Sequence, residues 1–466
     1  MPARFVNLDR ETPMLLPPDL RDWVAKDDLV RFVIDAVEMC ELSKAKINHR
    51  GTGDAQFPPT MMLALLIYCY ANRLFSSRQI EQATYHHVSV RYICGNLHPD
   101  HDTIATFRRE NAGLLEDCFL AVLQLARELK AFGRLGTISV DGTKLDSRAS
   151  RRSNRKSNEL EEEIAELQQE IKGLIGEAER ADGVPQEEKN TLAKTLQSKQ
   201  DRCAALRVAK AQLEERQRAA HRDRLRQAKG IVSLDLEDPK DPGEGGAESQ
   251  PGSDGSPSTE TPPIAKRDAE MAINLVESDS RLMTNADGQF GQRYNAQFAV
   301  DAGEERSQFI FGSKLTNECN DRRSLPVGVK AVPQPFREEI SGVLSDTGYD
   351  NADLIAAVEN KFGVTVLCPP QQAEAPAPTK HRLTKVEQRR RELSEVMRER
   401  LKKPESKQLY RRRMASIEPV FSVIKNVMGF RRFRLFGLAK AQIELTLISV
   451  AYNLRRLTQM AAVGAI

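Results

Sequence analysis

The stretch Gly136-Thr-Ile-Ser-Val-Asp141 places alternating apolar residues directly before a carboxylate, which a glycine follows. This alternation predicts a strand in which Ile138 and Val140 share one face while Asp141 lies on the other. An aspartate that ends a strand can point into a cleft, because the sheet fixes its direction. Aspartate is also a common turn residue, so this position alone does not establish a site.

Four more segments carry strand signals, and all of them lie far along the chain. They are residues 294–300, 307–315, 342–346 and 364–368. A helix is expected over 351–362, between the last two strands. Strands that first follow each other like hairpins and are then joined through a helix predict an α/β fold with a mixed five-stranded sheet and flanking helices. Asp346 closes the fourth strand, as Asp141 closes the first.

A long insertion separates the first strand from the others. Residues 152–228 carry apolar residues at heptad spacing on both sides of a turn at 182–185, which predicts an antiparallel coiled-coil hairpin. Residues 229–266 are rich in Pro, Gly, Ser and acids, a composition typical of a disordered linker. The segments 131–151 and 267–466 would then form one interrupted domain.

Residues 1–130 are expected to form an all-helical domain for DNA binding or assembly. Pro58-Pro59 precedes an apolar stretch where proline suits a first helical turn, and Ser76-Ser-Arg-Gln79 matches a capping box. The box predicts a helix to about residue 85, followed by a short helix over 88–94. Two short helices around a tight turn resemble a helix-turn-helix, but the pattern is also common in small helical bundles.

The net charge of +3 hides an uneven distribution along the 466 residues. Residues 380–466 hold 21 Lys and Arg against 7 Asp and Glu, with clusters at 389–391, 411–413 and 431–434. Clustered basic side chains bind phosphates by releasing condensed counterions, which favours a nucleic acid as partner. A solvated helix face is the alternative interpretation of each cluster by itself.

Several classes of protein are disfavoured by what the sequence lacks. The longest apolar run, residues 61–70, is shorter than the roughly 20 residues of a membrane-spanning helix, and the first residues do not resemble a secretory signal. The seven cysteines are scattered, without Cys-x-x-Cys, as expected of reduced thiols in a cytoplasmic protein. No phosphate-binding loop of the Gly-x4-Gly-Lys-Ser/Thr type occurs, so no nucleoside triphosphate is expected.

A third carboxylate, Glu418, lies in the basic region within Ser416-Ile-Glu-Pro-Val-Phe421. Because proline disfavours helical geometry in the residue before it, Pro419 favours a position of Glu418 at a helix entrance. Asp141, Asp346 and Glu418 would be a sufficient ligand set for two Mg²⁺ ions, which prefer carboxylate oxygens. Other acids near strand ends, Asp146, Asp301 and Asp321, are interpreted as turn residues.

At this point the chain resembles a family, the DDE transposases of bacterial insertion sequences, which have a ribonuclease-H-like catalytic domain. Three blocks carry the resemblance: Val140-Asp-Gly-Thr-Lys144, Leu344-Ser-Asp-Thr-Gly-Tyr349 and Tyr410…Arg413…Glu418…Lys425. The last block is similar to the signature Y-x2-R-x3-E-x6-K. It departs from that signature because four residues separate Arg413 from Glu418, and Met414 stands at the expected arginine position.

The resemblance implies that Asp141, Asp346 and Glu418 are a catalytic triad that binds two Mg²⁺ or Mn²⁺ ions. It further implies binding of terminal inverted repeats, cleavage at the element ends and strand transfer into target DNA by a homo-oligomer in the cytoplasm, associated with the nucleoid. The residues expected to bind DNA are Tyr410, Arg411, Arg412, Arg413, Lys425, Arg431, Arg432 and Arg434. Two alternatives stay open: a metal-dependent nuclease or domesticated DNA-binding protein without transposition, and a coiled-coil scaffold that binds nucleic acid.

Overall fold

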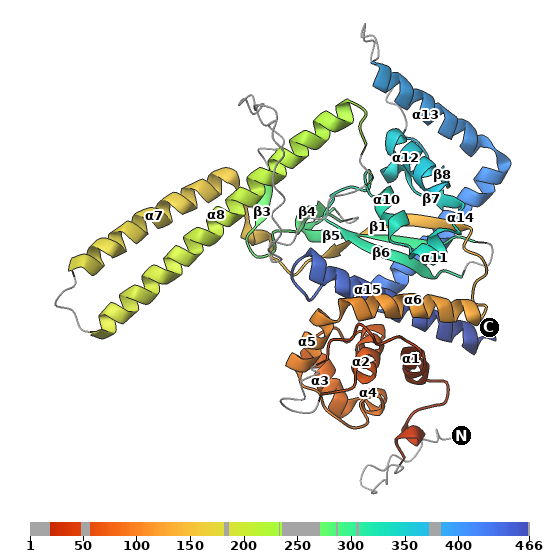
Figure 1. Cartoon of the computed structure of the whole chain (residues 1–466), viewed down its shortest axis with the longest axis horizontal. Helices are drawn as coiled ribbons and strands as arrows, with labels where there is room; N and C mark the ends of the chain where they lie inside the picture. The colour runs from red at the N-terminus through yellow and green to blue at the C-terminus, as the bar shows by residue number, and fades with distance from the viewer. Residues whose placement is uncertain are drawn as a thin grey trace, which may run out of the picture. The chain divides into compact units, whose positions relative to one another are not determined.

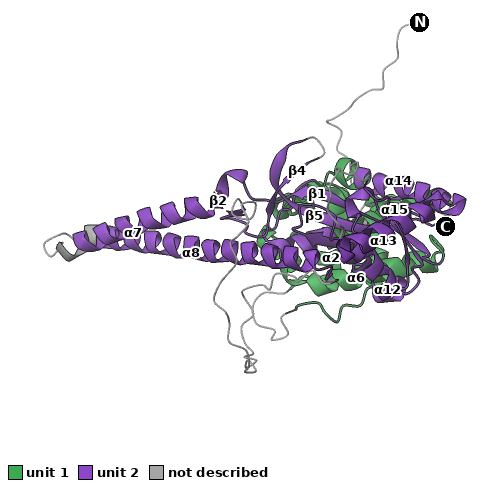
Figure 2. Ribbon diagram, turned by 90° about the horizontal axis from the view of Figure 1, so that it is seen from above, with its two compact units in different colours: residues 1–133, 423–430, 446–466 green, residues 134–422, 431–445 purple. Residues whose placement is uncertain are grey.

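The computed structural model describes residues 19–47, 56–180, 186–232, 234, 271–285, 288–303, 307–371 and 384–464 (Figure 1). The predicted linker lies almost wholly outside these residues, as does the expected turn at 182–185. The chain divides into two compact units (Figure 2). Unit 1 comprises residues 1–133, 423–430 and 446–466, and unit 2 comprises residues 134–422 and 431–445.

The N-terminal part of unit 1 is helical, as its apolar spacing predicts. Its helices are η1 (Leu20–Trp23), α1 (Leu29–Glu38), α2 (Pro59–Ala71), α3 (Ser77–His86), α4 (Val88–Ile93), α5 (His101–Glu110) and α6 (Ala112–Glu128). Helix α2 begins at Pro59, where the missing N–H costs no helical hydrogen bond, and it is buried from Met62 onward. The capping box is confirmed at the start of α3, where the Ser76 N–H donates to Gln79 Oε1 at 3.3 Å.

Unit 1 also contains two C-terminal segments, residues 423–430 and 446–466, which the sequence patterns grouped with the catalytic domain. The first includes the π-helical turn η4 (Val423–Val427), and the second holds most of α15 (Leu438–Ala462). Buried Phe430 packs edge-on against Phe75, with ring centroids 5.3 Å apart. The Arg73 guanidinium donates to the Val427 carbonyl at 2.7 Å. These contacts join parts of the chain that are about 350 residues apart in sequence.

Unit 2 is built on one mixed sheet of six strands. These are β1 (Thr137–Asp146), β4 (Arg281–Thr284), β5 (Phe290–Asp301), β6 (Ile310–Thr316), β7 (Gly342–Leu344) and β8 (Thr365–Leu367). Strand β5 pairs antiparallel with β1 on one side and with β4 and β6 on the other. Strands β1, β7 and β8 run parallel. All five predicted strands form and the mixed α/β class is confirmed, while β4 is an additional strand that alternation did not reveal.

Strand β1 is longer than the sequence predicted, because it does not end at Asp141. Its pairing with β5 continues without interruption from Ile138 opposite Asp301 to Asp146 opposite Arg293. The prediction that Asp141 ends the strand is therefore wrong, since the antiparallel partner β5 continues the pairing through Gly142. On its other side β1 pairs with β7 only as far as Ser139. Asp141 consequently lies where β1 runs on beyond the end of its parallel neighbour.

Helices cover both faces of the sheet. They are α10 (Leu325–Lys330), α11 (Gln334–Arg337), η3 (Thr347–Tyr349), α12 (Ala352–Phe362), α13 (Lys385–Lys402) and α14 (Pro404–Ser422). Helix α14 packs on the face that carries Asp141, where Ser416 Oγ lies 2.7 Å from Ser139 Oγ. Helix α10 packs on the opposite face, where Gly328 lies against the Val140 side chain. The site face of β1 is thus the face beneath α14.

The insertion forms a helical hairpin of α7 (Ser157–Arg180) and α8 (Gln186–Ala228), which extends from the short strand pair β2 (Asn154–Lys156) and β3 (Ala272–Asn274) (Figure 1). Ion pairs link Glu161 to Lys210 and Glu170 to Lys199, so the helices run antiparallel. The apolar side chains between them come mostly from the predicted heptad positions: Leu160, Leu167, Cys203, Leu206, Ala209 and Leu213, with Ile164 and Ile171 partly buried.

The cysteines and the absence of a membrane-spanning helix, both expected from the sequence, can be compared with the described residues. All seven cysteines are free, and six are buried while Cys319 is exposed. Among the helices of the described ranges, none combines the length and the apolar character needed to cross a bilayer.

Candidate active site

Asp141 on β1 and Asp346, two residues after the end of the parallel strand β7, occupy equivalent positions relative to the β1–β7 pairing. Ser139 pairs with Leu344, and each aspartate lies two residues beyond that pair. Because side chains alternate along a strand, this register directs both carboxylates to the same face, at the edge where β7 has ended. Asp346 also caps the short helix η3, where its Oδ1 accepts the Gly348 N–H at 2.9 Å.

The two carboxylates share one nitrogen of Arg413, a residue of α14. Its Nη2 lies 3.5 Å from Asp141 Oδ2 and 3.6 Å from Asp346 Oδ2. The arginine is 9% exposed, and its Nε and Nη1 are buried without a hydrogen-bond partner in the described part of the chain. Burying a guanidinium whose N–H groups have no hydrogen-bond partners lowers the stability of the folded protein. One arginine thus supplies the positive charge for two acids through a single nitrogen.

Burial dominates the ionisation of Asp141. The side chain is only 14% exposed, and desolvation raises its pKa to about 7. Arg413 lowers this pKa and the charge of Asp346 raises it, but the guanidinium does not offset the loss of water. An aspartate that is half protonated near neutral pH marks a site with too little positive charge, and such sites are often functional.

Glu418 does not join this pair. It is exposed on α14, five residues beyond Arg413. Within the residues that the structure describes, no group of three or more His, Cys, Asp or Glu side chains is placed to hold a metal ion. The structure therefore brings two of the three predicted acids together and leaves the third on the helix that carries their shared arginine.

The prediction that Glu418 lies at a helix entrance is wrong, because α14 continues through Pro419 to Ser422. A proline inside a helix cannot donate to the carbonyl four residues earlier, which here belongs to Ala415. The Gln308 side-chain amide donates to this carbonyl at 3.1 Å. An outside donor thus replaces the hydrogen bond that Pro419 removes, and Glu418 stays within the helix.

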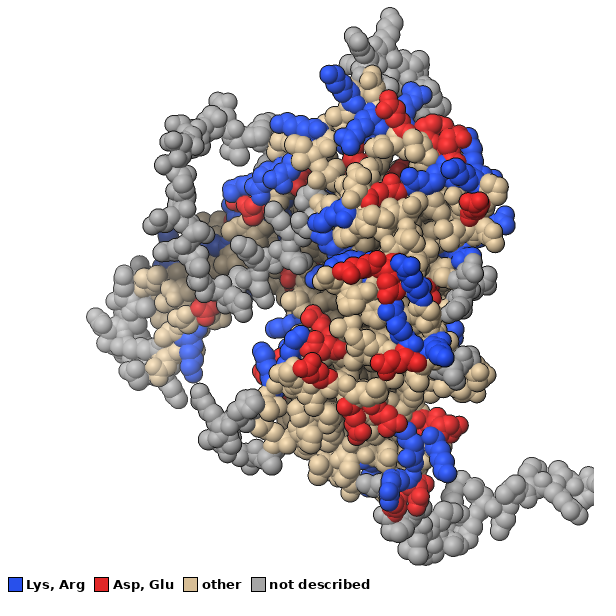
Figure 3. All heavy atoms as spheres, turned by 45° about the vertical axis from the view of Figure 1, so that its right-hand side comes forward, with Lys and Arg blue, Asp and Glu red and all other residues tan. Residues whose placement is uncertain are grey.

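The basic segment after η4 is held in a fixed, extended form. The Asp146 N–H donates to the Arg431 carbonyl at 3.0 Å, and the Phe433 N–H donates to the Asp146 carbonyl at 2.9 Å. Buried Glu444 accepts the N–H groups of Arg434 and Leu435. Phe433 is buried whereas Arg431, Arg432 and Arg434 are exposed, so the arginine side chains lie on the solvent side. Elsewhere, basic and acidic side chains are interspersed on the face shown in Figure 3.

The other residues expected to bind DNA differ in exposure. Tyr410 is half-buried, its hydroxyl donates to the Ser345 carbonyl at 3.2 Å, and burial raises its pKa to about 12. Arg411 is exposed, Arg412 is half-buried and Arg413 is turned inward to the acids. Lys425 is half-buried and belongs to unit 1.

The acids interpreted as turn residues have distinct partners. Asp146 pairs with Arg293 at 2.8 Å, so it is the ion-paired last residue of β1 rather than a turn residue. Asp301 is likewise the last residue of a strand, β5, and its Oδ1 accepts the Gly303 N–H at 2.9 Å in the segment that follows. Asp321 lies in a turn, and its carboxylate accepts hydrogen bonds from the side-chain amides of Asn295 and Gln297 on β5. Sequence reasoning missed this cluster, for which the only signal was the polar run Asn317-Glu-Cys-Asn-Asp321.

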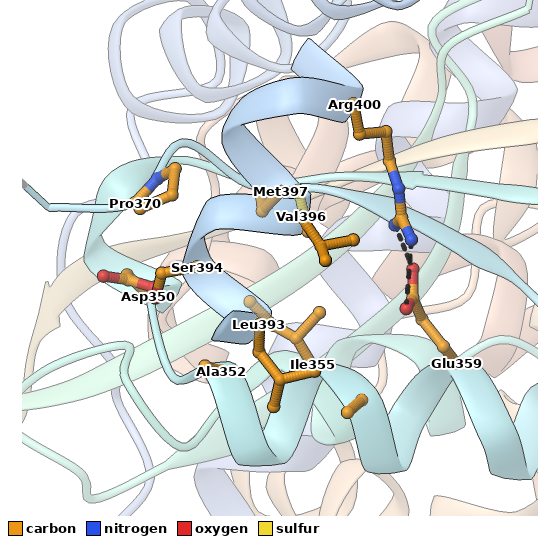
Figure 4. A pocket seen from close by; sticks show the side chains of 11 residues that line it. Asp350, Ala352, Ile355, Glu359, Pro370, Leu393, Ser394, Val396, Met397 and Arg400 are labelled. Carbon is orange, nitrogen blue, oxygen red and sulfur yellow. Dashed lines mark hydrogen bonds and ion pairs between the residues drawn. The ribbon is translucent and has the colours of Figure 1, made fainter. Parts of the chain in front are cut away.

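A small cavity between α12 and α13 lies apart from the acid pair (Figure 4). It has a volume of about 40 Å³ and is lined by apolar side chains such as Ile355, Leu393 and Met397. At its edge Arg400 binds Glu359, while Arg390 binds Asp353 at 2.5 Å. A space of this size holds little more than a water molecule. Two arginines of the basic C-terminal region thus link α13 to α12 through ion pairs.

Two family models match the chain. The "Transposase DDE domain" matches residues 366–458, and the "Transposase domain (DUF772)" matches residues 18–110. Searches of curated proteins and of solved structures gave no match. The two matches confirm the resemblance to DDE transposases of insertion sequences, and a DDE domain implies an enzyme that cleaves DNA and transfers strands. The first match includes Glu418 but neither Asp141 nor Asp346.

Proposed function

We propose that this protein binds the terminal inverted repeats of its insertion sequence and catalyses metal-dependent cleavage and strand transfer. The observation that carries the proposal is the equivalent position of Asp141 on β1 and of Asp346 just beyond β7, with Arg413 Nη2 within 3.6 Å of both. The mixed sheet with flanking helices supports a ribonuclease-H-like catalytic domain built from residues 131–151 and 267–466. Residues 1–130 and the hairpin 152–228 would serve DNA binding and assembly of a homo-oligomer.

The two aspartates fit a divalent metal such as Mg²⁺ or Mn²⁺. Their carboxylates are hard oxygen ligands, and burial has raised the pKa of Asp141 more than the nearby Arg413 lowers it. We infer that Asp141 and Asp346 would hold the metal, and that Glu418, which lies exposed on α14 apart from the pair, would have to move toward them to complete the ligand set. Two such ions, when bound, would activate a water or a 3′-hydroxyl and stabilise the leaving oxygen of the phosphodiester.

The chain's own residues have separate tasks in this scheme. Asp141 must lose its proton to serve as a ligand, and positive charge beside it favours the ionised form. Arg413 holds the two carboxylates at one place before catalysis and neutralises part of their charge. Arg431, Arg432 and Arg434 would bind DNA phosphates, since their backbone is fixed and their side chains are exposed.

The role of Glu418 is the sharpest test of this proposal. Glu418→Gln keeps the size of the side chain and removes its charge, so we expect DNA cleavage in Mn²⁺ to be lost while binding of end-containing DNA persists. Gel assays of cleavage and of binding measure the two effects. The matched control is Glu405→Gln, which changes another exposed acid of α14 and should cleave normally. Normal cleavage by Glu418→Gln would remove this residue from the site.

The arginine segment leads to a second prediction. If Arg431, Arg432 and Arg434 each neutralise one phosphate, replacing all three with Ala should reduce the slope of log affinity against log salt by about 0.9 per lost contact. Fluorescence anisotropy with labelled end DNA at several salt concentrations measures this slope. Arg207→Ala, at an exposed position of the hairpin, controls for the loss of charge alone. An unchanged slope in the triple variant would contradict the role of the segment.

A further inference from the structure

A buried hydrogen bond connects β5, the antiparallel partner of β1, to η3, the short helix that follows Asp346. Gln297 of β5 pairs in register with Gly142, the residue after Asp141. Tyr349 lies three residues after Asp346, at the end of η3. The Tyr349 hydroxyl donates to Gln297 Oε1, and both side chains are fully buried.

Asp321 fixes the orientation of the Gln297 amide. Its Oδ1 accepts the Gln297 Nε2 at 2.7 Å and the Asn295 Nδ2 at 2.7 Å. Because the amide nitrogen is engaged by a carboxylate, the amide oxygen is the atom that faces Tyr349. The three side chains of Asp321, Gln297 and Tyr349 therefore form one continuous chain of hydrogen bonds.

Gly142 leaves the space in which this chain of bonds lies. A Cβ atom at this position would lie 2.3 Å from Asp321 Oδ1 and 2.5 Å from Gln297 Nε2. Gly142 faces away from Asp141 because neighbouring residues of a strand point to opposite faces. These hydrogen bonds therefore lie on the face of β1 opposite the two carboxylates, where they do not compete with a metal for the aspartates.

The link matters because the β1–β7 ladder ends before the aspartates. Its last pair is Ser139 with Leu344, so Asp346 lies on a segment that the ladder no longer holds to β1. On the other side, that segment is attached to the residues around β8, where the Ser345 N–H donates to the Leu367 carbonyl and the Cys368 thiol donates to the Asp346 carbonyl. Because Gln297 lies on β5, which pairs with β1, the hydrogen bond from Tyr349 to Gln297 connects the Asp346 segment to β1 through β5.

We propose that Tyr349, Gln297 and Asp321 form a strut that sets the separation of Asp141 and Asp346. These are positioning residues, since none of them reaches the acid pair directly. The inference rests on the proposed function, in which the two aspartates hold metal together. Loss of one hydrogen bond of the strut should loosen the Asp346 segment and weaken the binding of metal to both acids.

The test compares Tyr349→Phe with Tyr294→Phe in the full-length protein. Each change removes one buried tyrosine hydroxyl from unit 2, but Tyr294 donates to Glu277, away from the strut. Binding of Mn²⁺ without DNA is measured from the loss of its free-ion electron paramagnetic resonance signal. We expect Tyr349→Phe to weaken Mn²⁺ binding about tenfold, as loss of a partner behind a metal ligand commonly does, and Tyr294→Phe to leave it unchanged.

A second readout needs no metal. The Cys368 thiol is buried against the Asp346 carbonyl, so its alkylation rate, followed by peptide mass spectrometry, reports opening of this segment. We expect a several-fold faster rate in Tyr349→Phe and in Gln297→Leu, but not in Tyr294→Phe. Unchanged labelling of Cys368, or equal effects of the two tyrosine variants, would overturn the strut. A wild-type protein that binds no Mn²⁺ would contradict the proposed function, and the labelling alone would then decide the strut.

Discussion

Asp141→Asn and Asp346→Asn are each expected to lower cleavage of end-containing DNA by about 10³-fold or more, the scale seen when one member of a catalytic unit is removed. Both carboxylates lie against one nitrogen of Arg413, so they act at one place and neither can replace the other. Binding of the same DNA should persist, because the exposed arginines at 431–434 are untouched. Cleavage of labelled DNA in Mn²⁺ gives the rates, and binding is measured in EDTA.

The matched control is Asp350→Asn, which changes an acid four residues after Asp346. The Asp350 carboxylate accepts the Gln371 N–H at 2.8 Å, and an asparagine can accept the same bond. This variant should therefore cleave at the wild-type rate. If Asp141→Asn or Asp346→Asn cleaved as fast as the control, the pair would not be the catalytic centre.

Much of the fold was predictable from the spacing of apolar residues. Alternation identified the strands at 136–141 and 294–300, three further apolar segments also formed strands, and heptad spacing identified the apolar positions between α7 and α8. The ends of elements depend on partners that are distant in sequence. Strand β1 continues past Gly142 because β5 pairs with it, and α14 continues past Pro419 because Gln308 supplies the missing donor. No local pattern contains these partners.

The candidate site was predictable only in part, for a similar reason. Asp141 and Asp346 could be singled out because each follows an apolar strand segment, and the family signature pointed to Glu418. The pairing of both aspartates with Arg413 depends on how α14 lies on the sheet, which spacing does not encode. The strut was missed because Gln297 and Tyr349 are 52 residues apart, and no local pattern indicates that the two side chains meet.

The raised pKa of Asp141 predicts that this residue costs stability when it is ionised. In the folded protein its pKa is about 7, against 3.8 for the free side chain, so between these values the folded state binds more protons than the unfolded state. Stability therefore falls as the pH rises from about 4 to 7, by at most about 4 kcal/mol from this group. Asp141→Asn removes the charge and should be more stable than the wild type above pH 7 in EDTA, with the difference vanishing near pH 4.

Thermal unfolding of the wild type and of Asp141→Asn between pH 4 and 8 measures this difference, with Asp350→Asn as the control that should follow the wild type. Mn²⁺ added at pH 8 should stabilise the wild type, because a ligand that binds only the folded state raises its stability, and should have a smaller effect on Asp141→Asn. The same desolvation that weakens the metal-free protein would thus favour a bound cation. A stability gain in Asp141→Asn that is equal at all pH values would show that Asp141 is already ionised well below pH 7, and that its site is not short of positive charge.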